Sequence, residues 1–342
     1  MKSSVQSIVA AMWRQPLKQD LSTTTSPSSF GQPYELVLVE NQIVPADKAR
    51  VGVHANALAY GTGTFEGIRA WWNAEHQQLY MFEAMAHYAR LERSARILGL
   101  RLPTPPATLV EMTAELLRRN DVRCDAYIRP LLIQYGDVLP VRMHDVQTRL
   151  SIAVTPVPGD YISPDGVRCM ISTWRRAPDS CTPNRAKVTG TYTGPSLAKT
   201  EAVSRGFDEA IMLTMDGYVA EATTSNIAMR IGSEWVTPAG TEDILEGITR
   251  AQVMVLLREA TGSPVVERRI HRSELYCCDE ILLCGTAAVV VPVVEVDGRK
   301  VGDGKPGEAT LALNSSLRAI ARRHDNRHPE WTTPVYGEEL RA

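Results

Sequence analysis

The alternation of apolar and polar residues predicts a chain that mixes strands with helices. Short apolar runs bounded by Gly, Pro, Asn or Asp have the length of strands and occur at 34–44, 126–135, 149–157, 167–174 and 279–301. Helical spacing of apolar residues predicts helices at 82–100, 106–119, 195–207, after Gly247, and at 305–323. Asp216-Gly217 separates two further strand-like runs and is typical of a β-hairpin. Because strands and helices do not alternate in regular βαβ units, we expect an α+β fold.

The chain is long enough for two hydrophobic cores. At 342 residues it exceeds the size that one core usually serves. Residues 157–166, "VPGDYISPDG", are dense in Pro, Gly and Asp and indicate an interdomain linker. We therefore expect a smaller α+β domain over 34–156 and a larger domain over 167–342. Residues 1–33 include a stretch rich in Ser, Thr and Pro and predict a flexible arm, with a targeting peptide as the alternative.

Composition and charge narrow the kinds of partner. The net charge is −2 and 22% of the residues are charged, so nothing draws the chain to nucleic acid or to a membrane surface. No apolar run reaches the length of a membrane span. The six cysteines and seven histidines do not have the spacing of metal ligands, so we expect no metal. The adjacent Cys277 and Cys278 suit reduced thiols, which predicts a cytoplasmic protein.

Lys187 stands out because lysine is rare in this chain. Only seven of the 37 basic residues are lysines. Lys187 lies in "NRAKVTGTY" (184–192), where small neighbours leave room beside its amine. Desolvation lowers the pKa of a lysine and favours the neutral amine that forms Schiff bases. The alternative is a surface lysine in a loop, which is how we interpret Lys199, on a helical segment with Glu201 and Arg205.

Glu221 and Arg90 are candidates for holding a charged cofactor. Glu221, in "YVAEATTSN" (218–226), ends an apolar strand. A carboxylate there could keep the proton on a cationic ring nitrogen, such as that of pyridoxal phosphate. Arg90 lies inside the first predicted helix, and arginine binds phosphate well. The alternatives are a solvated carboxylate and a solvated helical arginine.

Two glycine-containing turns could bind an anion. Gly247 in "LEGITR" precedes a predicted helix that begins with Ile248 and Thr249. Free N–H groups at a helix start attract anions, and Thr249 adds a hydroxyl. Gly285-Thr286 follows a buried strand and could offer a second hydroxyl with further N–H groups. Taken alone, each turn could also be only the boundary of an element.

The order of these motifs resembles the fold class IV pyridoxal phosphate (PLP) enzymes. The chain is most similar to the branched-chain amino acid aminotransferases, over roughly residues 34–320. The motifs that carry the resemblance are "YGTGTFEGIRAW" (60–71), "HYARLERSA" (87–95), "AYIRPL" (126–131), "NRAKVTGTY", "YVAEATTSN", "LEGITR" and "CGTAA" (284–288).

The resemblance implies a two-domain, D-amino acid aminotransferase-like fold that forms a homodimer or a higher homo-oligomer. It implies that PLP is the cofactor, held in the larger domain. It also implies ping-pong transfer of an amino group from an L-amino acid, branched-chain or related apolar, to a 2-oxo acid such as 2-oxoglutarate.

The resemblance assigns a role to each matching residue. Lys187 would hold PLP as a Schiff base and move a proton between substrate Cα and cofactor C4′. Tyr192 would lie beside the ring oxygen, and Glu221 would bind the pyridine nitrogen. The phosphate would be held by Arg90, Ile248 (through its backbone), Thr249 and Thr286. The residues expected around the substrate are Tyr60, Phe65, Tyr127, Arg129, Ala287 and Ala288.

Two departures from the family pattern bear on the substrate. The loop at 136–145 brings Arg142 and His144 where glycine is expected, and "ATTSN" after Glu221 is poor in glycine. Arg142 is a candidate for reading an extra carboxylate or polar group, so the substrate could differ from leucine, isoleucine or valine. The alternatives within the fold are a D-amino acid or (R)-amine transaminase, and an aminodeoxychorismate lyase that releases pyruvate without an amino acceptor. A non-catalytic relative is the remaining alternative.

Overall fold

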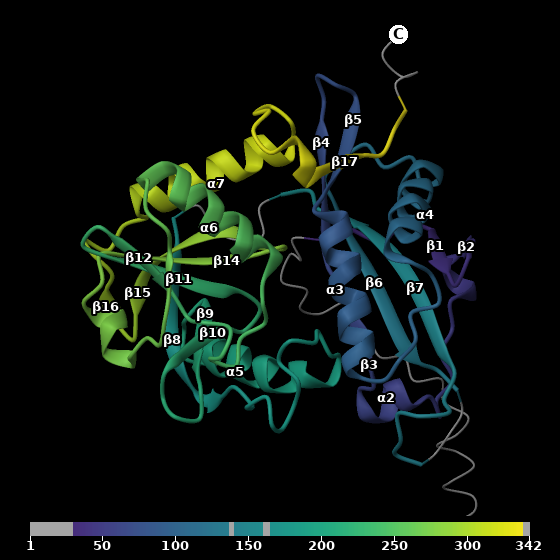
Figure 1. Cartoon of the computed structure of the whole chain (residues 1–342), viewed down its shortest axis with the longest axis horizontal. Coiled ribbons are helices and arrows are strands. Elements are labelled where there is room, and N and C mark those ends of the chain that lie inside the picture. The colour runs from purple at the N-terminus through teal and green to yellow at the C-terminus, as the bar shows by residue number, and fades with distance from the viewer. Residues whose placement is uncertain (1–29, 137–139, 160–164, 338–342) are drawn as a thin grey trace, which may run out of the picture.

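The structure is a computed structural model that describes residues 30–136, 140–159 and 165–337. It has two β-sheets that lie side by side, each covered by helices (Figure 1). Most of the expected arm, residues 1–29, lies outside the described residues, as does the middle of the expected linker, residues 160–164.

The first sheet is antiparallel and, within the described ranges, has eight strands in the order β17-β5-β4-β6-β7-β1-β2, with β3 paired to β6. The longest pair is β6 with β7, which runs from Ala126 opposite Pro156 to Gln134 opposite Thr148. The strands are β1 (Leu36–Val39), β2 (Gln42–Pro45), β3 (Gly63–Phe65), β4 (Ile68–Asn73), β5 (Gln78–Phe82), β6 (Ala126–Gln134), β7 (Thr148–Pro156) and β17 (Thr332–Pro334).

Two long helices cover the first sheet. They are α3 (Ala84–Ile97) and α4 (Pro106–Arg119), and this half also has the shorter helices α2 (Asn56–Tyr60) and η1 (Ala46–Lys48). Tyr88 and Leu91 of α3 recur at helical spacing and pack with Leu116 of α4 and Ile128 of β6 in one core. The periodicity therefore determines which side of α3 is buried, and the opposite side is left for the second sheet (Figure 1).

The second sheet is mixed and has nine strands in the described residues, in the order β10-β9-β8-β15-β14-β11-β12-β13, with β16 paired to β15. Strand β8 pairs in parallel with both β9 and β15. The strands are β8 (Val167–Arg175), β9 (Glu209–Leu213), β10 (Val219–Ala222), β11 (Asn226–Ile231), β12 (Glu234–Thr237), β13 (Val266–Glu267), β14 (Glu280–Gly285), β15 (Val289–Val296) and β16 (Arg299–Lys300).

Helices of the second half also tie the two sheets together. They are α5 (Thr193–Ser204), α6 (Ile248–Thr261) and α7 (Glu308–Ala321), with the short helices η2 (Gly190–Tyr192), η3 (Arg272–Tyr276) and η4 (Pro329–Trp331). One apolar core combines Trp71 and Phe82 of the first sheet with Leu256 of α6 and Leu317 of α7. This shared core, together with the return of β17 to β5, holds the sheets against each other.

The expected elements of the described chain are confirmed, and the α+β class with them. The predicted helix at 106–119 coincides with α4, and the others begin and end within a few residues of the observed ones. The motif at 60–71, for which the pattern predicts no strand, contains β3 and part of β4. The domain boundary at 157–166 stays a prediction. None of the helices in the described ranges is long and apolar enough to cross a membrane.

Candidate active site

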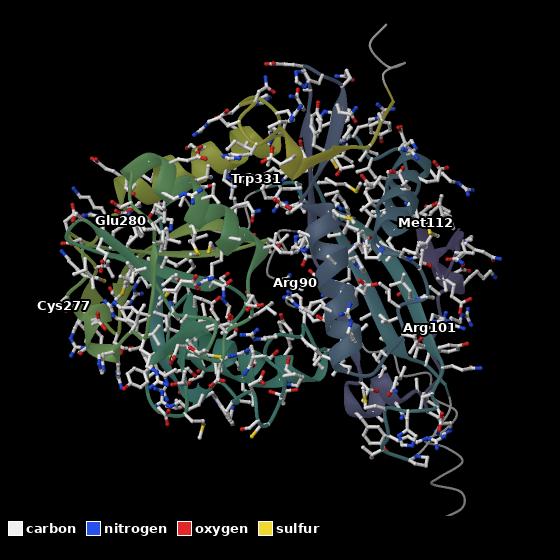
Figure 2. The ribbon with its side chains drawn as sticks, in the orientation of Figure 1. Arg90, Arg101, Met112, Cys277, Glu280 and Trp331 are labelled. Carbon is white, nitrogen blue, oxygen red and sulfur yellow. The ribbon has the colours of Figure 1, made fainter. Side chains whose placement is uncertain are left out.

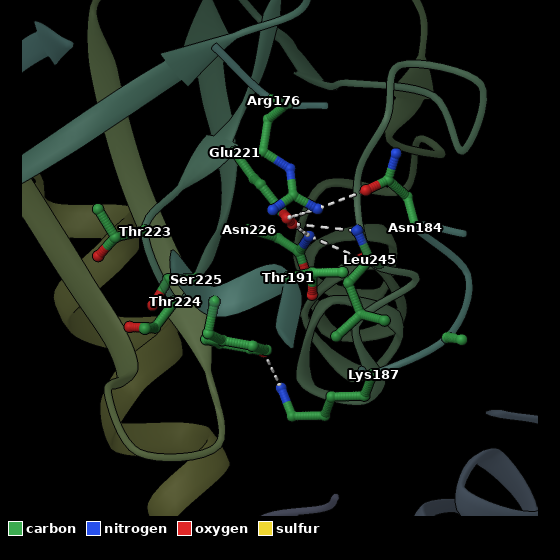
Figure 3. Close-up of a pocket in the computed structure, with 12 residues that line it drawn as sticks. Arg176, Asn184, Lys187, Thr191, Glu221, Thr223, Thr224, Ser225, Asn226 and Leu245 are labelled. Atoms are coloured by element: carbon green, nitrogen blue, oxygen red, sulfur yellow. Dashed lines mark hydrogen bonds and ion pairs between the residues drawn. The ribbon is translucent and has the colours of Figure 1, made fainter. Parts of the chain in front are cut away.

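Three of the candidate residues line one hollow at the edge of the second sheet (Figure 3). The hollow contains about 460 Å³ of space, including its open side. Its lining includes Lys187, Tyr192, Glu221, Arg176, Ser225 and Asn226. The loop before α5, strand β10 and the start of β11 therefore meet here.

Lys187 is fixed by contacts that cross between the two sheets. Its backbone N–H donates to Ser94 Oγ of α3 at 3.1 Å. Its carbonyl accepts from Thr64 Oγ1 at 2.9 Å and from the Phe65 N–H at 3.1 Å. The amine donates to Tyr192 Oη at 2.6 Å and lies 4.9 Å from the centre of the Phe65 ring. Lys187 is thus held at the junction of the sheets, beside a hydroxyl and an aromatic face.

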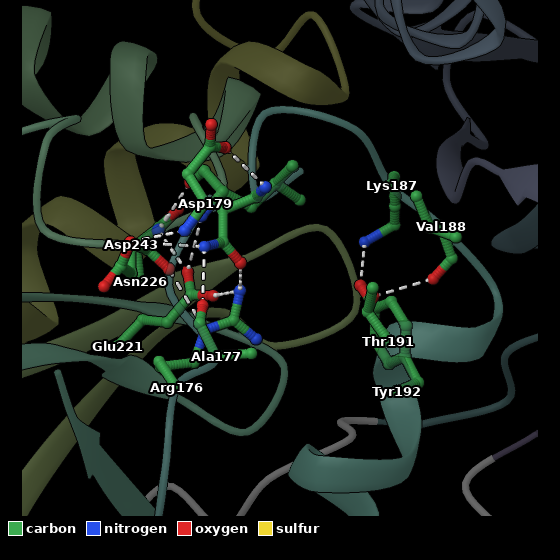
Figure 4. Close-up of polar contacts among 12 residues, drawn as sticks. Arg176, Ala177, Asp179, Lys187, Val188, Thr191, Tyr192, Glu221, Asn226 and Asp243 are labelled. Atoms are coloured by element: carbon green, nitrogen blue, oxygen red, sulfur yellow. Dashed lines mark hydrogen bonds and ion pairs between the residues drawn. The ribbon is translucent and has the colours of Figure 1, made fainter. Parts of the chain in front are cut away.

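Glu221 is a buried carboxylate with several partners (Figure 4). It is 7% exposed, and Oε1 lies 3.1 Å from the Arg176 guanidinium. Oε2 accepts from Asn226 Nδ2 at 2.9 Å and from the Leu245 N–H at 3.2 Å. Burial raises the pKa of Glu221 above its ordinary value, although Arg176 opposes the shift. A second cation beside this carboxylate would offset its desolvation.

Arg176 connects Glu221 to the loop that carries Lys187. It donates to Asn184 Oδ1 at 2.8 Å and to the Asp243 carbonyl at 3.1 Å. Asn184 in turn donates to the Ala177 carbonyl at 2.8 Å. Figure 4 shows this network on one side of the site and the pair of Lys187 and Tyr192 on the other. Arg176 was not among the residues predicted from the sequence.

Arg90 points from α3 toward the second sheet and is 6% exposed (Figure 2). Its Nε and one Nη donate to the two oxygens of Glu66 at 2.7 and 2.8 Å. The other Nη donates to the Glu246 carbonyl at 3.0 Å. Because Glu246 comes two residues before Ile248, Arg90 lies at the start of α6.

The other phosphate candidates surround that helix start. Ile248 borders a second hollow together with Arg90, and Thr249 borders a third together with Thr286. Helix α6 has Gly247 at its N-cap and no side-chain cap, so its first N–H groups are available to an anion. Gly285 lies close to Ser225, because a Cβ added to Gly285 would be 3.2 Å from Ser225 Oγ. Since Ser225 lines the Lys187 hollow, the turn that carries Thr286 adjoins that hollow.

Aromatic rings and a guanidinium stack outward from Lys187. The Phe65 ring lies 4.9 Å from that of Tyr192. The Arg129 guanidinium lies 4.7 Å from the centre of Phe65 and 5.2 Å from that of Tyr127. Arg129 also donates to Tyr127 Oη at 3.3 Å. Three of the expected substrate residues thus form one wall beside the lysine.

The lining of the Lys187 hollow includes none of the remaining substrate candidates, Ala287, Ala288 and Tyr60. Ala288 is 7% exposed, and the Ala287 carbonyl accepts from Arg69 Nη1 at 3.3 Å. Tyr60 ends α2 and is 44% exposed. In the described part of the loop at 136–145, Arg142 is outside the lining of the Lys187 hollow.

Comparison with known proteins agrees with this geometry. The family described as amino-transferase class IV matches residues 63–296. A probable branched-chain-amino-acid aminotransferase of Aquifex aeolicus is 43% identical over 303 residues, which are 88% of this chain and 97% of that protein. The chain belongs to the class IV aminotransferases.

Solved class IV structures have the same fold. The branched-chain aminotransferase of Thermoproteus uzoniensis with norvaline aligns with a TM-score of 0.84 at 37% identity, covering 89% of this chain and 100% of that one. The branched-chain amino acid aminotransferase of Thermobaculum terrenum in its PLP-form aligns with a TM-score of 0.84 at 32% identity, covering 89% and 99%. The resemblance, the fold class and the enzyme class inferred from the motifs are confirmed.

The groups present in this class IV enzyme fit pyridoxal phosphate. The cofactor needs an amine, a carboxylate for its ring nitrogen and donors for its phosphate. Lys187 and Glu221 supply the first two in one hollow. Arg90 and the uncapped start of α6 supply the third at its border. A cationic ring nitrogen beside Glu221 would favour the ionised carboxylate, which burial disfavours.

Proposed function

We propose that this class IV enzyme is a PLP-dependent branched-chain amino acid aminotransferase. It moves an amino group from an L-amino acid, branched-chain or related apolar, to a 2-oxo acid such as 2-oxoglutarate. The observation that carries the proposal is the meeting of the Lys187 amine and the buried Glu221 carboxylate in one hollow. The names of the three relatives described above, all branched-chain aminotransferases, support this substrate class.

Separate residues would hold the reactive carbon, the ring and the phosphate of the cofactor. Lys187 would bind it covalently, with Tyr192 beside the ring oxygen and Glu221 at the ring nitrogen. Arg90, the Ile248 N–H, Thr249 and Thr286 would hold the phosphate at the start of α6 and the turn after β14. When bound, pyridoxal phosphate supplies the carbon that receives the amino group and a ring that takes up negative charge from substrate Cα.

Besides holding the cofactor, Lys187 would transfer protons during the reaction. With substrate bound, the Lys187 amine would remove the proton from substrate Cα and would return a proton at cofactor C4′. Tyr192 Oη accepts a hydrogen bond from this amine at 2.6 Å and would help to hold the amine in place. Glu221, whose ionised form Arg176 favours against the effect of burial, would hold the proton on the ring nitrogen. The same proton transfers in reverse would serve the 2-oxo acid, as a ping-pong cycle requires.

The residues beside Lys187 favour a site that binds an apolar amino acid in one half of the reaction and a dicarboxylic acid in the other. Phe65 and Tyr127 offer aromatic faces to an aliphatic side chain. Arg129 lies between them and is exposed, so it could pair with the distal carboxylate of glutamate or 2-oxoglutarate. Ala287 and Ala288 would present N–H groups to the α-carboxylate, and Tyr60 would complete the substrate site. Arg142 stays a candidate for a further polar contact.

The assembly and location are further proposals. We infer a homodimer or higher homo-oligomer because several large apolar side chains around α2 are exposed, namely Val51, Val53, Leu58, Tyr60 and Val141. We infer a cytoplasmic location because all six cysteines, which lie in the described part of the chain, are free thiols.

A steady-state assay tests the proposed function. With 2-oxoglutarate as acceptor, we expect glutamate to form from L-leucine, L-isoleucine and L-valine, and more slowly from D-alanine or an (R)-amine. Preference for D-alanine or the amine would support the alternative transaminases. Release of pyruvate from aminodeoxychorismate without an acceptor would support the lyase.

A further inference from the structure

Glu66 and His87 form a buried pair directly behind Arg90. Glu66 follows β3 and is fully buried, and His87 lies on α3 and is 1% exposed. His87 Nδ1 lies 2.7 Å from Glu66 Oε2, the same oxygen that accepts from Arg90. Neither residue belongs to those assigned to the cofactor or the substrate.

The protonation states of the pair follow from these contacts. Burial alone would raise the pKa of Glu66, but the charge and hydrogen bonds of Arg90, with a bond from His87, outweigh it and hold the pKa well below its ordinary value. An ionised carboxylate only accepts hydrogen bonds. Burial lowers the pKa of His87, so its ring is neutral, and it must donate to Glu66 from Nδ1.

These bonds determine how the guanidinium of Arg90 is oriented. Its N–H groups are planar and rigid. Two of its nitrogens face Glu66 and the third reaches the Glu246 carbonyl. The N–H groups that these bonds leave over are fixed in direction before any anion arrives. A guanidinium held in this way loses less conformational freedom on binding a phosphate than a mobile one would.

We propose that Glu66 and His87 are positioning residues that orient Arg90 toward the cofactor phosphate. This inference rests on the proposed function, in which Arg90 binds that phosphate. Glu66 holds the guanidinium through two bonds, and His87 holds Glu66. The negative charge of Glu66 would by itself repel a phosphate, so its benefit has to come from orienting Arg90.

The test compares two ligands of the full-length apoenzyme: pyridoxal phosphate, and pyridoxal, which lacks the phosphate. Dissociation constants are measured by absorbance titration for the wild type, Glu66→Gln, Arg90→Ala and the double variant. We expect Glu66→Gln to weaken pyridoxal phosphate roughly tenfold or more and pyridoxal by less than about twofold. In the Arg90→Ala background, Glu66→Gln should have no further effect on the preference for pyridoxal phosphate.

Two further sets of variants keep the inference falsifiable if Glu66→Gln folds poorly. His87→Leu should weaken pyridoxal phosphate selectively, whereas His87→Asn, whose amide can replace Nδ1–H, should restore most of the affinity. Glu280→Gln is the matched control. Glu280 lies on β14 of the second sheet and, like Glu66, is a buried carboxylate paired with an arginine, here Arg230 (Figure 2). The substitution should lower stability without changing the ratio of the two affinities.

The outcomes separate this inference from the proposed function. Equal weakening of both ligands by Glu66→Gln, or full additivity with Arg90→Ala, would overturn the positioning role. A wild type that binds pyridoxal as tightly as pyridoxal phosphate would instead overturn the phosphate site itself, whatever Glu66 does.

Discussion

Lys187 and Lys199 are both lysines, but their amines contact different kinds of group. Lys199 lies on α5, and its amine pairs with the Glu209 carboxylate at 2.9 Å. The described contacts of the Lys187 amine are the Tyr192 hydroxyl and the faces of two aromatic rings. These contacts favour Lys187 over Lys199 as the reactive amine.

Arg176 offers a test of the electrostatics at Glu221. Removing its charge by Arg176→Gln should raise the pKa of Glu221 further, because Arg176 opposes the effect of burial. As the pH is lowered, Glu221 would then take up its proton at a higher pH than in the wild type. The affinity for pyridoxal phosphate should therefore begin to fall at a higher pH as well.

Titrations of cofactor binding across pH measure this shift. The neighbouring Arg175, at the exposed end of β8, provides the control Arg175→Gln. An unchanged pH profile in Arg176→Gln, or the same change in both variants, would contradict the assigned role of Arg176.

At the residue scale, the sequence predicted residues that lie within short local motifs. It missed residues that only the tertiary fold brings to the site. Lys187 and Tyr192 are close in sequence, so their meeting could be anticipated. Arg176 is far from Glu221 in the chain and lies in no recognisable motif. Glu66 stood in a quoted motif without a role, because its two partners come from α3.

Helix α3 begins at a half-buried carboxylate, Glu83, that links it to α6. Glu83 is the N-cap residue of α3, and Gln252 of α6 donates to it at 2.5 Å. Burial raises the pKa of Glu83 to about 7, with a further contribution from Glu330. The group titrates higher in the folded than in the unfolded chain, so it stabilises the fold at acidic pH. That stability is lost as the pH rises from about 4.5 to about 7.

Glu83→Gln should remove this pH dependence. We expect the variant to be more stable than the wild type at pH about 8 and to lose that advantage at pH about 5. Urea unfolding at both pH values measures the difference. A larger gain at the acidic pH would contradict the raised pKa of Glu83.

At the element scale, periodicity predicted the helices and many of the strands, but it missed β3 and β4. Strand β3 covers three residues, Gly63–Phe65, which is too few for an alternating pattern to appear. Its position is determined by pairing with β6 and by an isolated bridge from Thr64 to Val188. Such pairing depends on the tertiary fold, so the contact that holds Lys187 at the junction of the sheets could not be predicted.

At the scale of the whole molecule, exposed apolar residues around α2 predict an interface between copies of the chain. Leu58 is 66% exposed and Val53 is 77% exposed. Sedimentation should give at least a dimer, and Leu58→Asp should reduce the sedimenting mass by burying a charge in the interface. The control is Met215→Asp, at an exposed turn of the second sheet. A monomeric wild type would contradict the proposed interface.

The visible spectrum of the PLP-loaded protein tests the central claim most directly, namely that Lys187 binds the cofactor for an L-amino donor. We expect a visible band in the wild type and in Lys199→Ala that bleaches on addition of L-leucine or L-glutamate, and no such band in Lys187→Ala. A band that persists in Lys187→Ala, or that only D-alanine or an (R)-amine bleaches, would contradict the account.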